Sequence, residues 1–253
     1  MKYSYVYRVA NNKKFTIFLV MNMKSLTDEM KNYIQYGTEE RRWEFKPPMA
    51  WSNNQKKKKY DIAKAAFAIS NTTSGGFIVL GIPQKRDRSN GIEFERKGLS
   101  ARQFNTFDNE DDIGRFLNEK TNQELKFEIY GDSVQIDGQN KKFVVIQIYE
   151  SQGAMPVICT CDFRTQDRHC RVEKGILYIR STSNPIESRT IKTNEEWEEL
   201  IRRLLSRKEE IIYKDLRVLC GNMKFGEKQQ VANKPNNQKR STEHDKFLRR
   251  DKL

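Results

Sequence analysis

Four consecutive lysines, Lys56 to Lys59, stand among aromatic residues in the first quarter of the sequence. Trp43 and Trp51 precede the run, and Tyr60 follows it directly. Lysines bind phosphate oxygens and aromatic rings stack on bases, so this combination suits a track for single-stranded nucleic acid. A run of like charges is equally well explained as a solvated surface. The pattern predicts a nucleic-acid-binding group made of Trp51, Lys56, Lys57, Lys58 and Lys59.

The overall charge favours the same class of partner. The chain of 253 residues has 47 basic and 34 acidic residues, which gives a formal net charge of +13. Such an excess attracts polyanions, chiefly RNA or DNA, although it also serves solubility alone. No window approaches the ~20 apolar residues of a membrane span, so no membrane association is expected. The sequence gives no indication of the oligomeric state.

A second polar group follows a predicted strand near the C-terminal third. The strand Ile176 to Arg180 ends in Ser181-Thr182-Ser183-Asn184, which is rich in hydroxyl and amide donors. Arg180, Ser181 and Ser183 are therefore candidate phosphate contacts. The alternative is an ordinary connection between a strand and a helix.

The stretch from Met155 to Lys174 contains one histidine and three of the four cysteines, namely Cys159, Cys161, His169 and Cys170. A tetrahedral zinc site can be built from such ligands. The spacing argues against zinc, because His169 and Cys170 are adjacent and Cys159 and Cys161 are separated by a single residue. Buried or free thiols fit better, and four cysteines in a chain of this length indicate a reducing cytoplasm.

Nucleotide hydrolysis has no support in the sequence. Neither a Gly-x-x-x-x-Gly-Lys-Ser/Thr phosphate loop nor a Gly-x-Gly-x-x-Gly motif occurs.

The lysine run lies inside a stretch, Glu39 to Ile82, that predicts a strand, a helix, a glycine turn and a second strand. Trp43 and Phe45 alternate with Glu44 and Lys46, so each pair is expected on its own face of the first strand. The segment from Tyr60 to Asn71 is apolar or small on most of its helical circumference, which predicts a buried helix. Gly75-Gly76 supplies the turn, and Phe77 to Leu80 is expected to be a central strand.

The rest of the chain predicts an α+β protein with a mixed sheet. A helix is expected between Ser25 and Gly37, and a polar loop from Pro83 to Gly91. Strand candidates are Leu125–Tyr130, Ser133–Ile136 and Phe143–Tyr149, with turns at Asp132 and Asp137-Gly138. A long amphipathic helix from Glu195 to about Tyr213 carries an apolar stripe, expected to pack in the core or on a partner, at Trp197, Leu200, Ile201, Leu204 and Leu205.

These elements suggest three divisions of the chain. Residues 1–22 form an N-terminal extension, in which Phe15 to Met21 favours an edge strand. Residues 23–215 form the folded domain, and residues 216–253 form a basic, disordered tail.

The ordered set of motifs resembles the Alba-like domain of the Schlafen family and its prokaryotic relatives. The motifs are Glu44-Phe45-Lys46, Ala66-Phe67-Ala68-Ile69-Ser70-Asn71 with Gly75-Gly76, Val79-Leu80-Gly81-Ile82, and the closing segment Gly175 to Ser183. The resemblance extends over roughly residues 30–207. It implies an α+β domain that handles nucleic acid and that acts in some members as a ribonuclease.

The resemblance also implies a candidate catalytic site of Glu39, Glu44 and Lys46. In the Schlafen nucleases a glutamate precedes the Glu-Phe-Lys glutamate by five positions, as Glu39 precedes Glu44. Such a pair of carboxylates can hold Mg²⁺ or Mn²⁺ and activate water against a phosphodiester. The nuclease pattern has an aspartate just after the second strand, where this chain has Gly81-Ile82-Pro83-Gln84; Asp87 is the nearest substitute.

Two functions therefore fit the sequence. The first is a module that binds RNA or DNA, and the second is a metal-dependent endoribonuclease that cleaves structured RNA. An alternative for Glu44 is an ion pair with Lys46 or Arg42.

Overall fold

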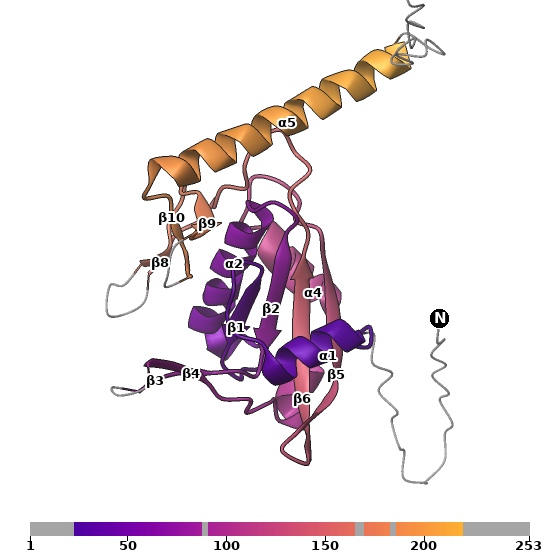
Figure 1. The fold of residues 1–253 in the computed structure, drawn as a ribbon, viewed down its shortest axis with the longest axis vertical. Coiled ribbons are helices and arrows are strands. Elements are labelled where there is room, and N and C mark those ends of the chain that lie inside the picture. The colour runs from indigo at the N-terminus through magenta and orange to yellow at the C-terminus, as the bar shows by residue number, and fades with distance from the viewer. Residues whose placement is uncertain (1–22, 88–90, 165–169, 183–185, 220–253) are drawn as a thin grey trace, which may run out of the picture. The chain divides into compact units, whose positions relative to one another are not determined.

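The computed structural model describes residues 23–87, 91–164, 170–182 and 186–219 (Figure 1). The predicted N-terminal extension and most of the predicted tail lie outside these residues. The chain divides into two compact units between Ile211 and Ile212, and the account below concerns the first.

A four-stranded mixed sheet forms the centre of the first unit, with the strand order β1-β2-β6-β5. β1 and β2 are parallel, whereas β2 and β6, and β6 and β5, are antiparallel. In the described residues five α-helices accompany this sheet, which confirms the predicted α+β class. The four strands are β1 (Trp43–Lys46), β2 (Gly76–Leu80), β5 (Phe127–Ile136) and β6 (Gln139–Ile148).

Both faces of the sheet are covered, and the central strands show why. In β2, Ile78 and Leu80 belong to one buried cluster, whereas Phe77 and Val79 belong to the other. Successive side chains of a strand point to opposite faces, so a continuous apolar run fills two cores. Helix α1 (Asp28–Tyr36) covers one face and crosses in front of the sheet in Figure 1. The helices on the other face are α2 (Lys56–Ser70), α3 (Ala101–Phe104) and α4 (Glu110–Asn118), with short 3-10 turns η1 (Asn53–Gln55) and η2 (Asn105–Phe107).

Helix α2 packs its small residues against the sheet. Ala63, Ala66 and Phe67 are completely buried. The helix begins at Lys56 rather than at Tyr60, because the lysines form its first turn instead of a separate bridge.

Several predicted boundaries are corrected by the structure. β5 runs without interruption through Asp132, where a turn was predicted, and the hairpin to β6 is made at Asp137 and Gly138, which both have positive φ. Side chains rarely adopt such φ values, and a two-residue turn of this kind matches the twist of the strands. The predicted loop Pro83 to Gly91 instead contains the strand β3 (Gln84–Asp87), which pairs with β4 (Gly91–Phe94) beyond the loop. α1 is capped by Thr27, not Ser25.

The remaining short strands form two small antiparallel pairs beside α2. β7 (Phe163–Arg164) pairs with β8 (Cys170–Val172), and β9 (Tyr178–Arg180) pairs with β10 (Ser188–Thr190). Together they bring the end of the domain back to its first strand.

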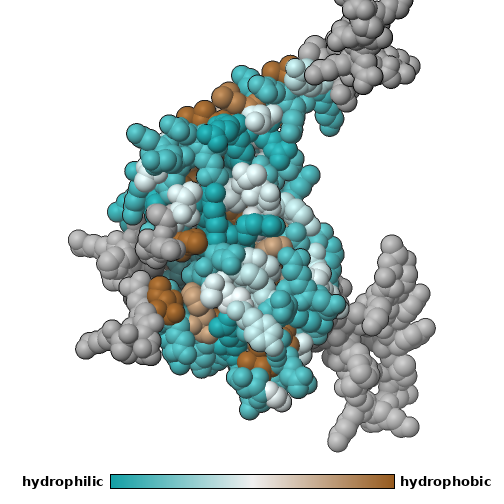
Figure 2. Space-filling model, viewed as in Figure 1, coloured by the Kyte–Doolittle hydropathy of each residue, from teal (hydrophilic) through white to brown (hydrophobic). Residues whose placement is uncertain are grey.

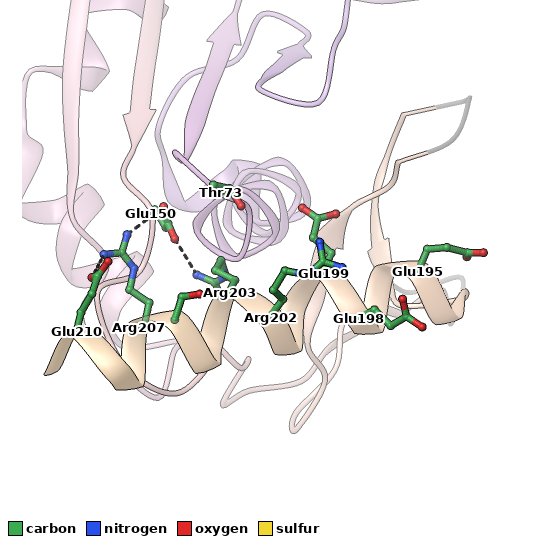
Figure 3. A pocket seen from close by; sticks show the side chains of 10 residues that line it. Thr73, Glu150, Glu195, Glu198, Glu199, Arg202, Arg203, Arg207 and Glu210 are labelled. Atoms are coloured by element: carbon green, nitrogen blue, oxygen red, sulfur yellow. Dashed lines mark hydrogen bonds and ion pairs between the residues drawn. The ribbon is translucent and has the colours of Figure 1, made fainter. Parts of the chain in front are cut away.

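Helix α5 (Asn194–Leu219) differs from the prediction in the face that it buries. Trp197, Ile201 and Leu205, predicted to be core or partner residues, are about half exposed, whereas Leu200 is buried. Ion pairs hold the helix against the rest of the first unit: Arg203 and Arg207 both pair with Glu150 in the loop after β6 (Figure 3). None of the helices in the described part of the chain has the length and hydropathy of a membrane span.

Candidate functional site

Strand β1 places Glu44 on the α2 side of the sheet. Trp43 and Phe45 pack in the cluster beneath α1, so the alternation of the strand turns Glu44 and Lys46 to the other face, as predicted. Glu44 is only 3% exposed. The neighbouring β2 approaches β1 closely because Gly76 has no side chain: a Cβ there would clash with the carbonyl oxygen of Arg42.

Three donors surround the Glu44 carboxylate. Arg180 Nη1 and Ser188 Oγ each donate to Oε2 at 2.5 Å, and Lys46 Nζ donates to Oε1. Burial alone would raise the pKa of Glu44. The charges of Lys46 and Arg180, with hydrogen bonds from Lys46 and Ser188, outweigh burial and hold this pKa below its ordinary value. Glu44 is therefore an ionised carboxylate with two cationic partners.

Arg180 is the organising cation of this cluster, and the prediction that it contacts phosphate is wrong. Its side chain is completely buried. Besides Glu44, it donates through Nη2 to the carbonyl oxygen of Glu40 at 2.9 Å and through Nε to that of Arg41 at 3.3 Å. A guanidinium whose donors are directed to protein groups in a dry environment has none to offer to nucleic acid. The local sequence gave no sign of this, because Glu44 and Arg180 are 136 residues apart.

Glu39 lies at the edge of the same cluster. Its Oε1 accepts from the backbone N–H of Phe45 at 3.4 Å and lies 3.9 Å from Arg180 Nη2. Burial, together with the charge of Glu44, raises the pKa of Glu39, and the charges of Arg180 and Lys46 oppose the rise. The two glutamates are thus neighbours with opposite pKa shifts.

A pocket of about 220 Å³ opens beside this cluster. Helix α2 contributes Asp61 and Lys64, and β3 contributes Gln84, which stands in the segment where the nuclease pattern has an acid. Sequence reasoning missed Asp61 and Lys64. They are the only charged residues between Tyr60 and Asn71, and this interruption of an apolar helix was a usable signal. The residues lining the pocket are Glu39, Glu44, Phe45, Lys46, Asp61, Lys64, Gln84, Arg180, Ile186, Glu187 and Ser188.

The arrangement does not fit Mg²⁺ or Mn²⁺ as it stands. Both oxygens of Glu44 accept from cationic side chains, so a metal would have to displace Lys46 or Arg180. Among the residues that the structure describes, no three carboxylates, histidines or cysteines gather in a way that could hold a metal ion. Asp87 ends β3, and its side chain lies outside the described part.

Trp51 and Lys59 are buried together, which corrects their predicted role as a base-stacking and phosphate-binding pair. The Trp51 side chain is 6% exposed and donates from Nε1 to Asp112 at 2.9 Å. Lys59 is 5% exposed, with Nζ 4.5 Å from the ring centres of both Trp51 and Phe116. Burial lowers the pKa of Lys59. Because Lys59 and Phe116 pack on the Trp51 ring and the ring is buried, it cannot stack on a base.

The other lysines of the run point outward to different extents. Lys56 and Lys57 are exposed, whereas Lys58 is half-buried and donates to the carbonyl oxygen of Pro48 at 3.1 Å. Ser181 is buried, and its Oγ accepts from the Glu187 N–H at 2.9 Å, so this candidate contact is part of the β9–β10 connection. Ser183 lies outside the described residues.

The proposed zinc ligands are only partly described. Cys159 is buried and Cys161 half-buried, with their sulfur atoms 3.9 Å apart and both thiols free. Burial raises the pKa of the Cys159 thiol to about 12. His169 and the side chain of Cys170 lie outside the described part.

Two solved structures are similar to this chain at low sequence identity. The DIP2311 protein of Corynebacterium diphtheriae is 15% identical with a TM-score of 0.34; the match covers 63% of this chain and 23% of that one. The N-terminal domain of a putative ATP-dependent DNA helicase RecG-related protein from Nitrosomonas europaea is 16% identical with a TM-score of 0.31; the match covers 68% and 97%. This chain therefore corresponds to less than a quarter of the first structure. No curated protein sequence matches it.

The family comparison agrees with the motifs in the sequence. The model described as "Schlafen, AlbA_2" matches residues 39–189, from the first glutamate of the site to the strand that carries Ser188. This range contains every residue that lines the pocket beside Glu44. The chain belongs to the Schlafen AlbA_2 family.

Proposed function

We propose that this protein binds nucleic acid, RNA or DNA, through phosphate contacts at the start of α2. Membership of the Schlafen AlbA_2 family suggests a function related to nucleic acid. The net charge of +13 favours a polyanionic partner.

The observation that carries the proposal is the composition of the first turn of α2. Four lysines occupy it, no acidic residue stands there, and Gln55 at the N-cap makes no side-chain hydrogen bond to the helix. The N-terminus of a helix has a partial positive charge and unpaired N–H groups, so lysines there cost about 0.3–1 kcal/mol each. A bound phosphate reverses this cost, because it pairs with the exposed Lys56 and Lys57 and with the helix N-terminus at once.

The groups suited to this contact are Lys56, Lys57 and Lys64. Lys56 and Lys57 are exposed. Lys57, Asp61 and Lys64 follow the i, i+4, i+7 spacing of one helix face, which connects the first turn with the pocket beside Glu44. The Glu44 carboxylate in that pocket repels phosphate weakly, since Lys46 and Arg180 neutralise it.

The test compares two single lysine variants. Each lost phosphate contact reduces the slope of log K against log salt by about 0.9 on duplex DNA or about 0.7 on a single strand. Lys57→Ala should reduce the slope by that amount on either duplex DNA or single-stranded nucleic acid. Lys126→Ala removes the same charge from an exposed position before β5 and should leave the slope unchanged. Equal slopes for wild type and Lys57→Ala on both nucleic acids would contradict the proposal.

The second candidate function is the metal-dependent endoribonuclease. The observation in its favour is that Glu39, Glu44 and Asp61 line one pocket. No catalytic step follows from the present geometry, because Glu44 is already paired with two cations. Incubation of the protein with structured RNA and Mn²⁺ decides the matter, provided that Glu44→Gln is first shown to be folded. Cleavage by wild type and none by a folded Glu44→Gln variant would establish the nuclease.

We also propose a cytoplasmic location, which free thiols at Cys159 and Cys161 support. Fractionation of the native source would test it.

A further inference from the structure

A second hollow opens next to the pocket described above, where the parallel strands β1 and β2 end. The pairing of the two strands stops at Lys46, whose carbonyl oxygen accepts from the N–H groups of both Gly81 and Ile82. Pro47 and Pro83 come next, and a proline has no N–H with which to continue the pairing. The two segments therefore part at the carboxyl ends of the strands, the edge at which open α/β sheets bind their ligands.

The lining of this hollow is largely apolar. Met49 and Ile62 line it from the buried core, whereas Pro47 is exposed and Pro83 is half-buried. Its volume is about 260 Å³. Pockets for drug-sized ligands have volumes of about 300–1,000 Å³, so this one suits a smaller, flat ring, and the sulfur of Met49 favours an aromatic one. Most of the surface in Figure 2 is hydrophilic, which makes an apolar hollow a local exception.

Three polar side chains also line the hollow. Lys58, in the first turn of α2, is held by the carbonyl oxygen of Pro48. Asp61 follows on the same helix, and Gln84 lies on β3. Gln84 is exposed, and among the described residues no protein group is hydrogen-bonded to its amide. Asp61 and Gln84 also line the pocket beside Glu44, so the two hollows are direct neighbours.

We propose that this hollow binds an unpaired nucleobase that has an amino group beside an unprotonated ring nitrogen, as adenine and cytosine have. This inference rests on the proposed function, in which phosphates bind at the start of α2. The Asp61 carboxylate accepts from the amino group, and the Gln84 amide both donates to the ring nitrogen and accepts from the amino group. Thymine and uracil have a carbonyl oxygen in place of the amino group, which would face the carboxylate unfavourably.

The position of the hollow fits a strand whose phosphates contact the first turn of α2. Lys57, the proposed phosphate contact, is the neighbour of Lys58, which lines the hollow. A base can enter only when it is unpaired and unstacked, because a duplex occupies its hydrogen-bonding edge. The partner is therefore a single strand, or the loop of a structured RNA, rather than a continuous duplex.

The first experiment measures the affinity of the full-length chain for an oligothymidylate and for the same strand with one central thymine replaced by adenine or by cytosine. Oligouridylates serve as the RNA equivalents. Adenine or cytosine should strengthen binding at least about fivefold, as one bidentate contact to a base does. Gln84→Leu should abolish this preference, and Gln135→Leu, at an exposed position of β5, should retain it. Equal affinity for all strands, or a preference that survives in Gln84→Leu, would overturn the proposal.

The second experiment separates this inference from the proposed function by measuring the salt dependence of the same strands. Lys57→Ala should reduce the slope of log K against log salt and leave the preference among bases unchanged, because it removes a phosphate contact only. Gln84→Leu should remove the preference and leave the slope unchanged. Salt-dependent binding without a preference would overturn the base pocket alone, whereas a failure to bind any strand would overturn both proposals.

Discussion

Among the described residues, the buried Glu44 and the half-buried Glu150 each bridge two cations, but the hydrogen bonds of those cations differ. Glu44 accepts hydrogen bonds from Arg180 and Ser188 at 2.5 Å and from Lys46. Glu150 lies 3.2 Å from Arg207 and 3.6 Å from Arg203, and also accepts from the backbone N–H of Ser74 at 2.9 Å. The first cluster joins β1 to β9 and β10, and the second joins the loop after β6 to α5.

The difference lies in the hydrogen bonds of the arginines. Arg180 donates from all three of its nitrogens, whereas the three nitrogens of Arg203 are buried and have no hydrogen-bond partner in the part of the chain that the structure describes. A buried ion pair stabilises a fold only when its geometry is good and its remaining donors are satisfied. We infer that the Glu44 cluster stabilises the whole fold, and that the Glu150 cluster stabilises the position of α5 more weakly.

The largest expected effect is on Glu44. Glu44→Gln leaves the buried Arg180 with only the more distant Glu39 as counter-charge and should lower the free energy of unfolding by about 3–5 kcal/mol. Because the pKa of Glu44 is lowered in the fold, its contribution is complete above the ordinary glutamate pKa and is lost as pH falls through the lower folded value. Urea denaturation at neutral and acidic pH measures both effects. Glu124→Gln, at an exposed position, is the control, and a loss equal to the control's would remove the distinction between the two clusters.

The second expected effect is local. Glu150→Gln should loosen α5 at a cost of about 1–3 kcal/mol, because its two arginines lose their counter-charge but one of them, Arg207, keeps a partner in Glu210. Hydrogen exchange should become faster in α5 from residue 199 to 207 and stay unchanged in β2 and β6. Faster exchange throughout the sheet would mean that α5 is integral to the core.

The third variant asks whether Arg203 stabilises the fold at all. Arg203→Met keeps the aliphatic length and removes three buried nitrogens that lack hydrogen bonds. Stability should stay within about 1 kcal/mol of wild type or rise, as when buried charges are replaced by apolar groups of similar volume. Thermal denaturation of Arg203→Met, compared with that of the control Arg202→Met at an exposed position, measures this change in stability. A loss comparable with that of Glu44→Gln would show that the two arginines are equivalent.

The smallest expected effect is at Glu39, the neighbour of Glu44. Because burial raises the pKa of Glu39, the folded state holds its proton more tightly than the unfolded chain does. Stability from this group is therefore gained as pH falls through its folded pKa, the reverse of Glu44. Glu39→Gln should change stability at neutral pH by less than about 1 kcal/mol and should abolish that gain at acidic pH. Urea denaturation of the variant at neutral and acidic pH measures both effects. A change of stability with pH identical to that of wild type would contradict the prediction.

Local pattern predicted the parts of the fold that depend on neighbouring residues. The alternation of Trp43 and Phe45 with Glu44 and Lys46 gave the correct faces of β1, and the small residues of α2 gave its buried surface. The predicted roles were wrong for residues whose environment is made by distant parts of the chain. Trp51 and Lys59 resemble a surface track in sequence but pack on Phe116, and Arg180 has its partner in β1. The apolar stripe of α5 predicted packing in the core or on a partner, and nothing local could show that Leu200 and the charged side chains of Arg203 and Arg207 face the rest of the first unit instead.

The separation of Glu44 and Arg180 has a consequence for synthesis of the chain on the ribosome. β1 and β2 are complete early, but the guanidinium that neutralises Glu44 and holds the backbone of Glu40 and Arg41 comes 136 residues after Glu44. Until then Glu44 has Lys46 beside it but lacks the hydrogen bonds of Arg180 and Ser188, so we expect the β1 edge of the sheet to be completed late. We therefore expect the nascent sheet to stay incomplete at this side until the last part of the domain has emerged and the ion pair between Glu44 and Arg180 can form.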